Sequence, residues 1–190
     1  MKGTSGGSAE SYWSMDSCLH LLPITGPVPG PCDIYSTGTA LLIPLGAGLV
    51  TGIRQSGADG TRCLTTDDLV VRDTTVGGLW ADAALEMLAA LGRLTAAHGT
   101  SLRRRRLGAG FHEVGVIDDL FPAAGLIAHP LLLRPTLRVL RGGPVVTTTE
   151  SGRLLVAEPG CQLPPSGQLS ALLGGEACGP ALRLTAGALL

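Results

Sequence analysis

The sequence predicts an α+β fold, in which one antiparallel sheet, a three-stranded meander plus a C-terminal hairpin, has helices packed on one face. Short apolar runs at 39–43, 49–55 and 61–65 are joined by glycine-containing turns, which is typical of antiparallel strands. The segment 76–99 repeats apolar residues at three- and four-residue spacing and predicts one long amphipathic helix. Apolar runs at 145–149 and 154–157 flank a Ser-Gly turn and predict the hairpin.

The domain organisation follows from length and composition. The chain has 190 residues, which suits one domain of ordinary size. Residues 1–17 are rich in glycine and serine and predict a flexible N-terminal arm. We expect a single α+β domain over 18–190, in which 160–190 either add a last strand near 182–185 or are loosely packed.

The first part of the domain contains two segments that are poor in charge. Four prolines between residues 19 and 32 predict an extended, irregular segment. Residues 34–53 are 20 uncharged residues, a run long enough to cross a bilayer. Four glycines and Pro44 would break a helix there, so we interpret the run as two buried strands joined by a turn and expect no membrane contact.

The segment 64–99 is the part of the chain in which independent rules agree best. It reads as the end of a strand, a polar connection, a helix and a glycine stop. Thr75 and its polar neighbours offer acceptors for the first helical N–H groups, and Gly99 supplies a left-handed stop. We expect the stripe from Val76 to Leu94 to be buried, with Trp80 as its anchor.

The remaining elements are predicted less directly. Residues 101–110 are polar and basic and predict a loop, and 114–117 form a strand or a buried turn. A short helix is expected at 120–128, and a second helix starts near Pro135 and ends at residues 142–143. In the hairpin, a two-residue Ser-Gly loop would place Glu150 opposite Arg153.

Motifs of catalysis and cofactor binding are missing or out of context. A Gly-x-Ser-x-Gly pattern at residues 3–7 has no preceding strand to make a nucleophile elbow. The sequence has no Walker loop, Gly-x-Gly-x-x-Gly, Cys-x-x-Cys or His-Glu-x-x-His pattern. We therefore expect no catalytic residue, no cofactor and no metal site. The 5 cysteines are widely and irregularly spaced, which predicts reduced thiols in a cytoplasm, and the arginine, alanine and glycine bias suggests a bacterial genome.

The polar residues around the basic segment are the candidate ligand-binding residues. They are Arg103, Arg104, Arg105, Arg106, His112, Glu113 and His129. The four arginines form the one charge run in the chain and suit contact with phosphate. A net charge of −1 and the lack of flanking aromatic residues make nucleic-acid binding a weaker interpretation.

The order of elements resembles that of a known group of proteins. The strings LTTDDL, LWADAALEML and VVTTTESGRLLVAEPG are similar in layout to the YtpQ-like uncharacterised bacterial proteins. In that group a strand leads through a threonine- and aspartate-containing turn into a helix with an alanine–leucine run. The spacer Gly77-Gly78 departs from the pattern, and the resemblance implies no activity.

These observations predict a soluble, non-enzymatic module that binds a protein or regulates one. A homodimer formed through a sheet edge or through residues 120–133 is one form of this hypothesis. One alternative is a small enzyme or ligand-binding protein with a site near 103–130. Another is nucleic-acid or phosphate binding through the four arginines.

Overall fold

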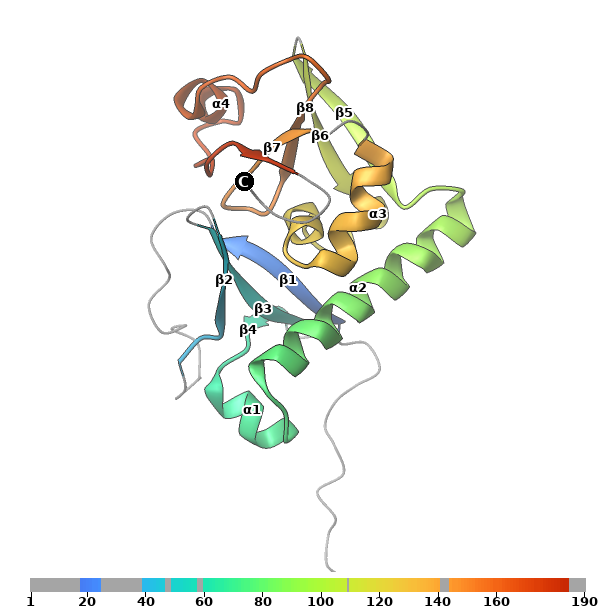
Figure 1. Ribbon diagram of the computed structural model, residues 1–190, viewed down its shortest axis with the longest axis vertical. Coiled ribbons are helices and arrows are strands. Elements are labelled where there is room, and N and C mark those ends of the chain that lie inside the picture. Colours follow the sequence, from blue (N-terminus) through green and yellow to red (C-terminus); the bar gives the residue numbers. More distant parts are fainter. Residues whose placement is uncertain are drawn as a thin grey trace, which may run out of the picture.

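The chain folds into two antiparallel sheets and four α-helices, which confirms the α+β class (Figure 1). The computed structural model describes residues 18–24, 39–46, 49–57, 60–108, 110–140 and 144–184. The predicted N-terminal arm lies outside these residues. The strands belong to two sheets rather than to one, because the meander and the C-terminal hairpin each pair with different neighbours.

The N-terminal sheet is built around one central strand. Its strands are β1 (Cys18–Ile24), β2 (Leu42–Gly46), β3 (Leu49–Gly57) and β4 (Gly60–Cys63). β1 lies along one edge of β3, whereas β2 and β4 follow one another along the opposite edge. The irregular segment predicted from residue 19 onwards was wrong for β1. Leu19 and Leu21 are buried there, and core packing outweighs the nearby prolines.

Two consecutive helices follow the N-terminal sheet. α1 (Thr66–Arg72) replaces the polar connection that was predicted, and a capping box between Thr65 and Asp68 starts it. α2 (Val76–His98) matches the predicted helix at both ends. The Thr75 hydroxyl accepts the Gly78 N–H at 3.1 Å, and Gly99 ends the helix at φ 76°.

The buried face of α2 largely follows the predicted stripe. Its fully or almost fully buried residues are Leu79, Ala83, Ala84, Met87, Ala90, Leu91 and Leu94. Val76 is exposed, and Trp80 is half-buried at the margin of the core, so the prediction of Trp80 as the central anchor was wrong. The Trp80 indole N–H donates to the Ala128 carbonyl at 3.0 Å, which favours this marginal position for an amphipathic ring.

The C-terminal sheet has five strands in the order β5-β6-β8-β7-β9. They are β5 (Leu102–Gly108), β6 (Phe111–Val116), β7 (Val145–Thr148), β8 (Leu154–Ala157) and β9 (Leu182–Arg183). The basic loop predicted at 101–110 was wrong, because this segment is β5 and pairs with β6 along its whole length. The predicted β7–β8 hairpin is confirmed.

The turn of that hairpin differs from the prediction. The Thr149 N–H donates to the Arg153 carbonyl, so three residues rather than two form the loop. Gly152 has φ +85° in this loop, which glycine adopts without steric cost. Glu150 therefore does not face Arg153, and the side chain of Arg153 turns towards other carboxylates.

Short helical segments connect and cover the C-terminal sheet. They are the 3-10 helices η1 (Ile117–Asp119) and η2 (Ala123–Ile127), α3 (Pro130–Leu140) and α4 (Ser166–Leu172). The helix predicted at 120–128 is thus the single 3-10 helix η2. The next helix starts at Pro130, not near Pro135, because Pro130 takes the first-turn position that suits proline.

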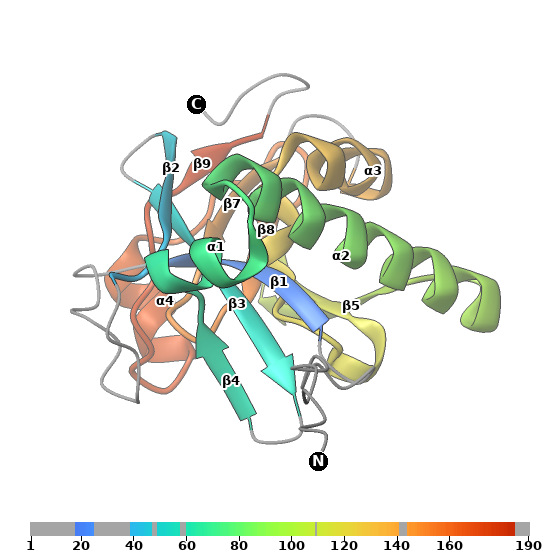
Figure 2. The same ribbon diagram turned by 90° about the horizontal axis from the view of Figure 1, so that it is seen from below.

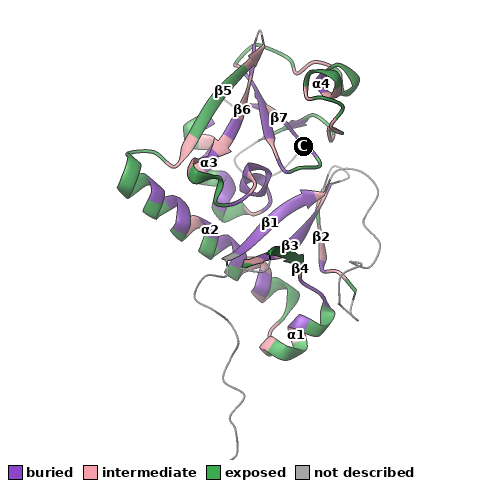
Figure 3. Cartoon of the chain, turned by 180° about the vertical axis from the view of Figure 1, so that it is seen from behind, coloured by how far each residue is buried: buried purple, intermediate pink, exposed green. Residues whose placement is uncertain are grey.

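One hydrophobic core connects the two sheets. It runs from Leu19 on β1 to Leu184 and includes the buried face of α2. η2 packs between β1 and α3, and α2 lies along the same side of the molecule as α3 (Figures 1 and 2). Burial is concentrated on the inner strands, whereas β5 is mostly exposed (Figure 3).

Among the described residues, no helix is both long and apolar enough to cross a membrane. Within the long uncharged run, residues 42–46 and 49–53 belong to strands β2 and β3, in agreement with the prediction of two strands.

Candidate functional site

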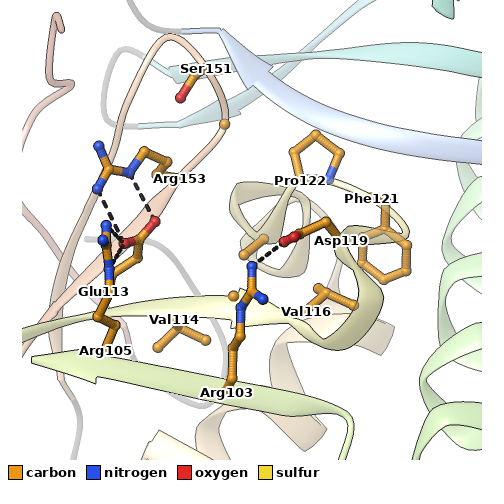
Figure 4. A pocket seen from close by; sticks show the side chains of 13 residues that line it. Arg103, Arg105, Glu113, Val114, Val116, Asp119, Phe121, Pro122, Ser151 and Arg153 are labelled. Carbon is orange, nitrogen blue, oxygen red and sulfur yellow. Dashed lines mark hydrogen bonds and ion pairs between the residues drawn. The ribbon is translucent and has the colours of Figure 1, made fainter. Parts of the chain in front are cut away.

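A pocket of about 610 Å³ opens between three segments of the C-terminal half (Figure 4). The β5–β6 hairpin forms its floor, the segment 119–123 forms one wall, and the β7–β8 turn forms another. Arginine and carboxylate side chains lie on the floor and the turn. Pro122 provides accessible apolar surface, whereas Val114, Val116 and Phe121 border the pocket but are buried.

The pairing of β5 with β6 decides which arginines reach the pocket. Residues opposite one another in an antiparallel pair point to the same face of the sheet. Arg105 pairs with Glu113 and Arg103 pairs with Gly115, and all four line the pocket. Gly115 leaves room for Arg103, because a Cβ atom there would lie 2.8 Å from the Arg103 Nε.

Glu113 is the centre of the charged network on the pocket floor. Its carboxylate accepts the Arg153 Nε–H at 2.8 Å on Oε1 and an Arg153 NH2 proton at 3.1 Å on Oε2. Oε2 also accepts from Arg105 Nε at 2.9 Å. Because the bonds from Arg153 stabilise the charged form and Arg105 adds to them, the pKa of Glu113 lies below its usual range although burial opposes this.

Arg153 also connects the pocket to a second carboxylate. Its NH1 group donates to Glu176 Oε2 at 3.2 Å, and the Ser151 N–H donates to Glu176 Oε1 at 2.9 Å. The bonds with Glu113 raise the pKa of Arg153 further above its ordinary value. Burial alone would raise the pKa of Glu176, but hydrogen bonds from Ser151, Thr149 and Arg153 lower it below the ordinary value.

The opposite rim of the pocket is held by a more exposed ion pair. Arg103 donates to Asp119, and their side chains are 57% and 72% exposed. Asp118 and Asp119 both have left-handed backbone, at φ 61° and 48°. Non-glycine residues adopt this conformation uncommonly, although aspartate tolerates it better than most. Asp118 in turn lies 3.5 Å from His98 at the end of α2.

The other candidate residues from the sequence lie elsewhere. Arg104 and Arg106 point to the opposite face of β5, where Arg104 donates to the Val139 carbonyl of α3. His112 shares that face, and burial followed by the nearby Arg104 charge lowers its pKa. His112 does not line the pocket.

His129 is separated from the pocket and has a structural environment. Its ring packs edge-on against Trp80 with the centroids 4.4 Å apart. Nδ1 accepts the Leu131 N–H at 3.1 Å near the start of α3, and burial lowers the pKa of His129. The structure therefore brings Arg103, Arg105 and Glu113 together but does not add His112 or His129 to them.

Three polar lining residues were not among the candidates from the sequence: Asp119, Ser151 and Arg153. Asp119 directly precedes the short helix expected at 120–128, and Arg153 was paired with Glu150 across a two-residue loop. The one indication in the sequence was that a charged residue, Arg153, directly follows the predicted Ser-Gly turn of the hairpin. The true partner of Arg153 is 40 residues away in the chain, so no local pattern identifies it.

The chemistry of this pocket favours binding. The lining contains no histidine, cysteine or lysine, and Glu113 is held ionised, so it is a poor proton donor near neutral pH. The Ser151 hydroxyl lies 3.3 Å from the Thr149 hydroxyl and also hydrogen-bonds Glu176, and the lowered pKa of that carboxylate makes it a weak base. Within the described ranges, no group of three or more His, Cys, Asp or Glu side chains is arranged to hold a metal ion.

The cysteines and the wider comparisons add no site. Cys161 and Cys178 are free thiols, and burial raises the pKa of Cys178. The resemblance in element order to the YtpQ-like proteins stays a prediction. No protein-family model, curated protein or solved structure matches the chain.

Proposed function

We propose that this protein is a ligand-binding module whose pocket takes a small molecule with an oxyanion group, a carboxylate or a phosphate. The observation that carries the proposal is the charge of the lining. Three guanidinium groups, those of Arg103, Arg105 and Arg153, face the pocket. Glu113 and Glu176 neutralise Arg105 and Arg153, whereas the described partner of Arg103 is only the exposed Asp119. Guanidinium groups suit carboxylates and phosphates, because their N–H fork matches two oxygens.

Arg103 is the residue best placed to meet the ligand. Glu113 is satisfied by two arginines, whereas Arg103 makes one described hydrogen bond, to the exposed Asp119. A guanidinium has five N–H donors, so most of those of Arg103 remain for a ligand. An incoming oxyanion would replace Asp119 as the partner of Arg103.

The rest of the pocket indicates what accompanies the oxyanion. A volume of about 610 Å³ lies in the range of small-molecule sites. Pro122 and the aliphatic stems of Arg103 and Arg105 line the pocket beside the charged groups. We therefore expect a ligand with an apolar part next to its anionic group, and phenyl phosphate and benzoate are suitable probes.

The direct test is titration calorimetry with phenyl phosphate at fixed low ionic strength. Arg103→Gln should weaken binding about tenfold, the effect of losing about 1.4 kcal/mol. Arg106→Gln is the matched control, because it removes the same charge from the same strand but on the other face. Equal losses in both variants, or no saturable binding by the native protein, would refute the proposal.

Nucleic-acid binding through the four arginines is less favoured than this proposal. The arginines alternate between the two faces of β5, and Arg103 and Arg105 already pair with carboxylates. A phosphate backbone needs a continuous basic track. Location in a bacterial cytoplasm stays a prediction.

A further inference from the structure

The outer edge of β5 differs from every other sheet edge among the described residues. β5 has seven residues, and its central four residues are exposed. It is the terminal strand of its sheet and pairs with β6 alone. Unpaired backbone N–H and C=O groups on such an edge accept another extended chain.

The remaining edges are short or covered. β9 has two residues, and β2 and β4 have five and four. The outer edge of β1 is covered by α2, where the Leu19 N–H donates to Glu86 at 2.7 Å and the Leu21 N–H donates to the Met87 sulfur at 3.3 Å. β5 is therefore the long edge of the described fold, and it is open beyond Leu102, whose N–H and carbonyl are both bonded to the Thr100 hydroxyl.

The charge on β5 determines which chain would suit it. Arg103 and Arg105 lie on one face, and Arg104 and Arg106 lie on the other. In the described part of the chain, Arg104 and Arg106 bond to the backbone carbonyls of Val139 and Gly108 rather than to carboxylates. Neither guanidinium forms a described ion pair beside the open edge, and the carboxylate that acts on this face is Glu158, near His112.

A second copy of this chain is a poor partner for the edge. Two β5 strands that paired with one another would place arginines opposite or diagonal to arginines, and like charges across a strand pair are destabilising. The homodimer predicted through a sheet edge is thus disfavoured at β5. An acidic strand has the opposite effect, because each glutamate or aspartate would face an arginine.

We propose that the outer edge of β5 binds an extended acidic segment of a partner protein, which adds a sixth strand to the C-terminal sheet. Backbone hydrogen bonds to β5 provide the affinity. Acidic side chains on the α3 face, opposite Arg104 and Arg106, provide the selectivity. This surface is distinct from the ligand pocket, which lies on the other face of the hairpin.

The experiment uses a fluorescein-labelled seven-residue peptide of alternating glutamate and valine, measured by fluorescence anisotropy. The native protein should bind it saturably, and Arg104→Gln/Arg106→Gln should weaken binding about tenfold or more. Arg93→Gln/Arg183→Gln is the matched control, because both residues are exposed arginines on other elements. Equal weakening by both double variants, or equal binding of an alternating lysine–valine peptide, would overturn the proposal.

A second measurement tests strand addition itself. Two versions of the peptide are N-methylated, each on one alternate set of backbone amides, so that each blocks one edge of the strand. Only one version should lose binding, because an added strand bonds along one edge. Loss in both versions or in neither overturns the proposal, as does equally tight binding of oligothymidylate.

The two binding proposals are separable. Arg153→Gln should impair phenyl phosphate binding and leave the peptide affinity unchanged, since Arg153 lies on the β7–β8 turn and away from the outer edge of β5. A peptide affinity that falls in parallel with phenyl phosphate affinity would place the peptide in the pocket and overturn the edge proposal.

Discussion

Replacing Glu113 by glutamine should destabilise the protein and at the same time strengthen its binding of anions. The substitution keeps the shape of the side chain but removes the charge that Arg105 and Arg153 share. The Glu113 side chain is 18% exposed, and that of Arg153 is 23% exposed. The pair is therefore intermediate between a surface ion pair and a buried one.

The size of the effect follows from that intermediate burial. Exposed pairs contribute about 0–1 kcal/mol, and breaking a buried pair costs about 3–5 kcal/mol. We expect Glu113→Gln to lower the free energy of unfolding by about 2 kcal/mol. For a domain of this length, that loss corresponds to a Tm lower by about 4–8 °C. Differential scanning calorimetry measures both quantities.

The same substitution should raise affinity for phenyl phosphate. Removing one negative charge roughly 6 Å from the bound anion, at an effective dielectric constant of about 40, is worth about 1.4 kcal/mol, or a factor of about ten. Glu150→Gln is the control, because Glu150 is an exposed acid on the neighbouring turn. Unchanged stability, or weaker anion binding in Glu113→Gln, would show that this account of the network is wrong.

Three further outcomes test the account of the fold. The pKa of Glu113 is lowered in the folded state, so its contribution to stability is complete above the unfolded pKa of about 4.3 and is lost as the pH falls through the folded pKa. In urea unfolding between pH 6 and 3, the stability of Glu113→Gln should therefore depend less on pH than that of the native protein. Gly125→Ala should lower the free energy of unfolding by at least about 2 kcal/mol, because the new Cβ would lie 2.2 Å from the Leu21 carbonyl oxygen. Gly92→Ala, on the open face of α2, should instead raise it by about 0.5–1 kcal/mol. Urea midpoints that rank the two variants the other way would contradict the close contact. Trp80→Phe should cost about 1 kcal/mol or more through the lost bond to the Ala128 carbonyl, measured by chemical unfolding followed by circular dichroism, and an unchanged midpoint would show that the bond contributes nothing.

The sequence predicted best those elements that several local rules define together. α2 has an apolar stripe, a threonine cap and a glycine stop, so its ends could be placed at Val76 and His98. The β7–β8 hairpin likewise has two apolar runs around a turn. The turn itself was misassigned, because its length depends on backbone hydrogen bonds that the residue types do not specify.

β5 shows why the rest could not be predicted. Four consecutive arginines have no alternation of apolar and polar residues, which is the signal of a half-buried strand. An edge strand needs paired backbone on one side but no apolar face, and Arg103 to Arg106 are all exposed. Without the strand, the alternation that separates Arg103 and Arg105 from Arg104 and Arg106 could not be recognised.

The candidate site was therefore found in part. Arg103, Arg105 and Glu113 were among the candidate residues, because charged side chains were concentrated in that region of the sequence. Asp119 and Arg153 reach the pocket through tertiary contacts over 16 and 40 residues. His129 was included as a polar residue near the basic segment, but its ring packs against Trp80, outside the pocket.

The position of α2 has a consequence for how the molecule unfolds. At about 1.5 Å of rise per residue, its 23 residues extend roughly 35 Å, and its buried face belongs to the same core as both sheets. Unfolding of either sheet would expose apolar surface of α2 to water, and the other sheet shares the same core with that helix. We expect one cooperative transition, in which the slowest-exchanging amides of β3 and β8 open with the same free energy. Fragments cut after residue 100 should not fold as independent halves.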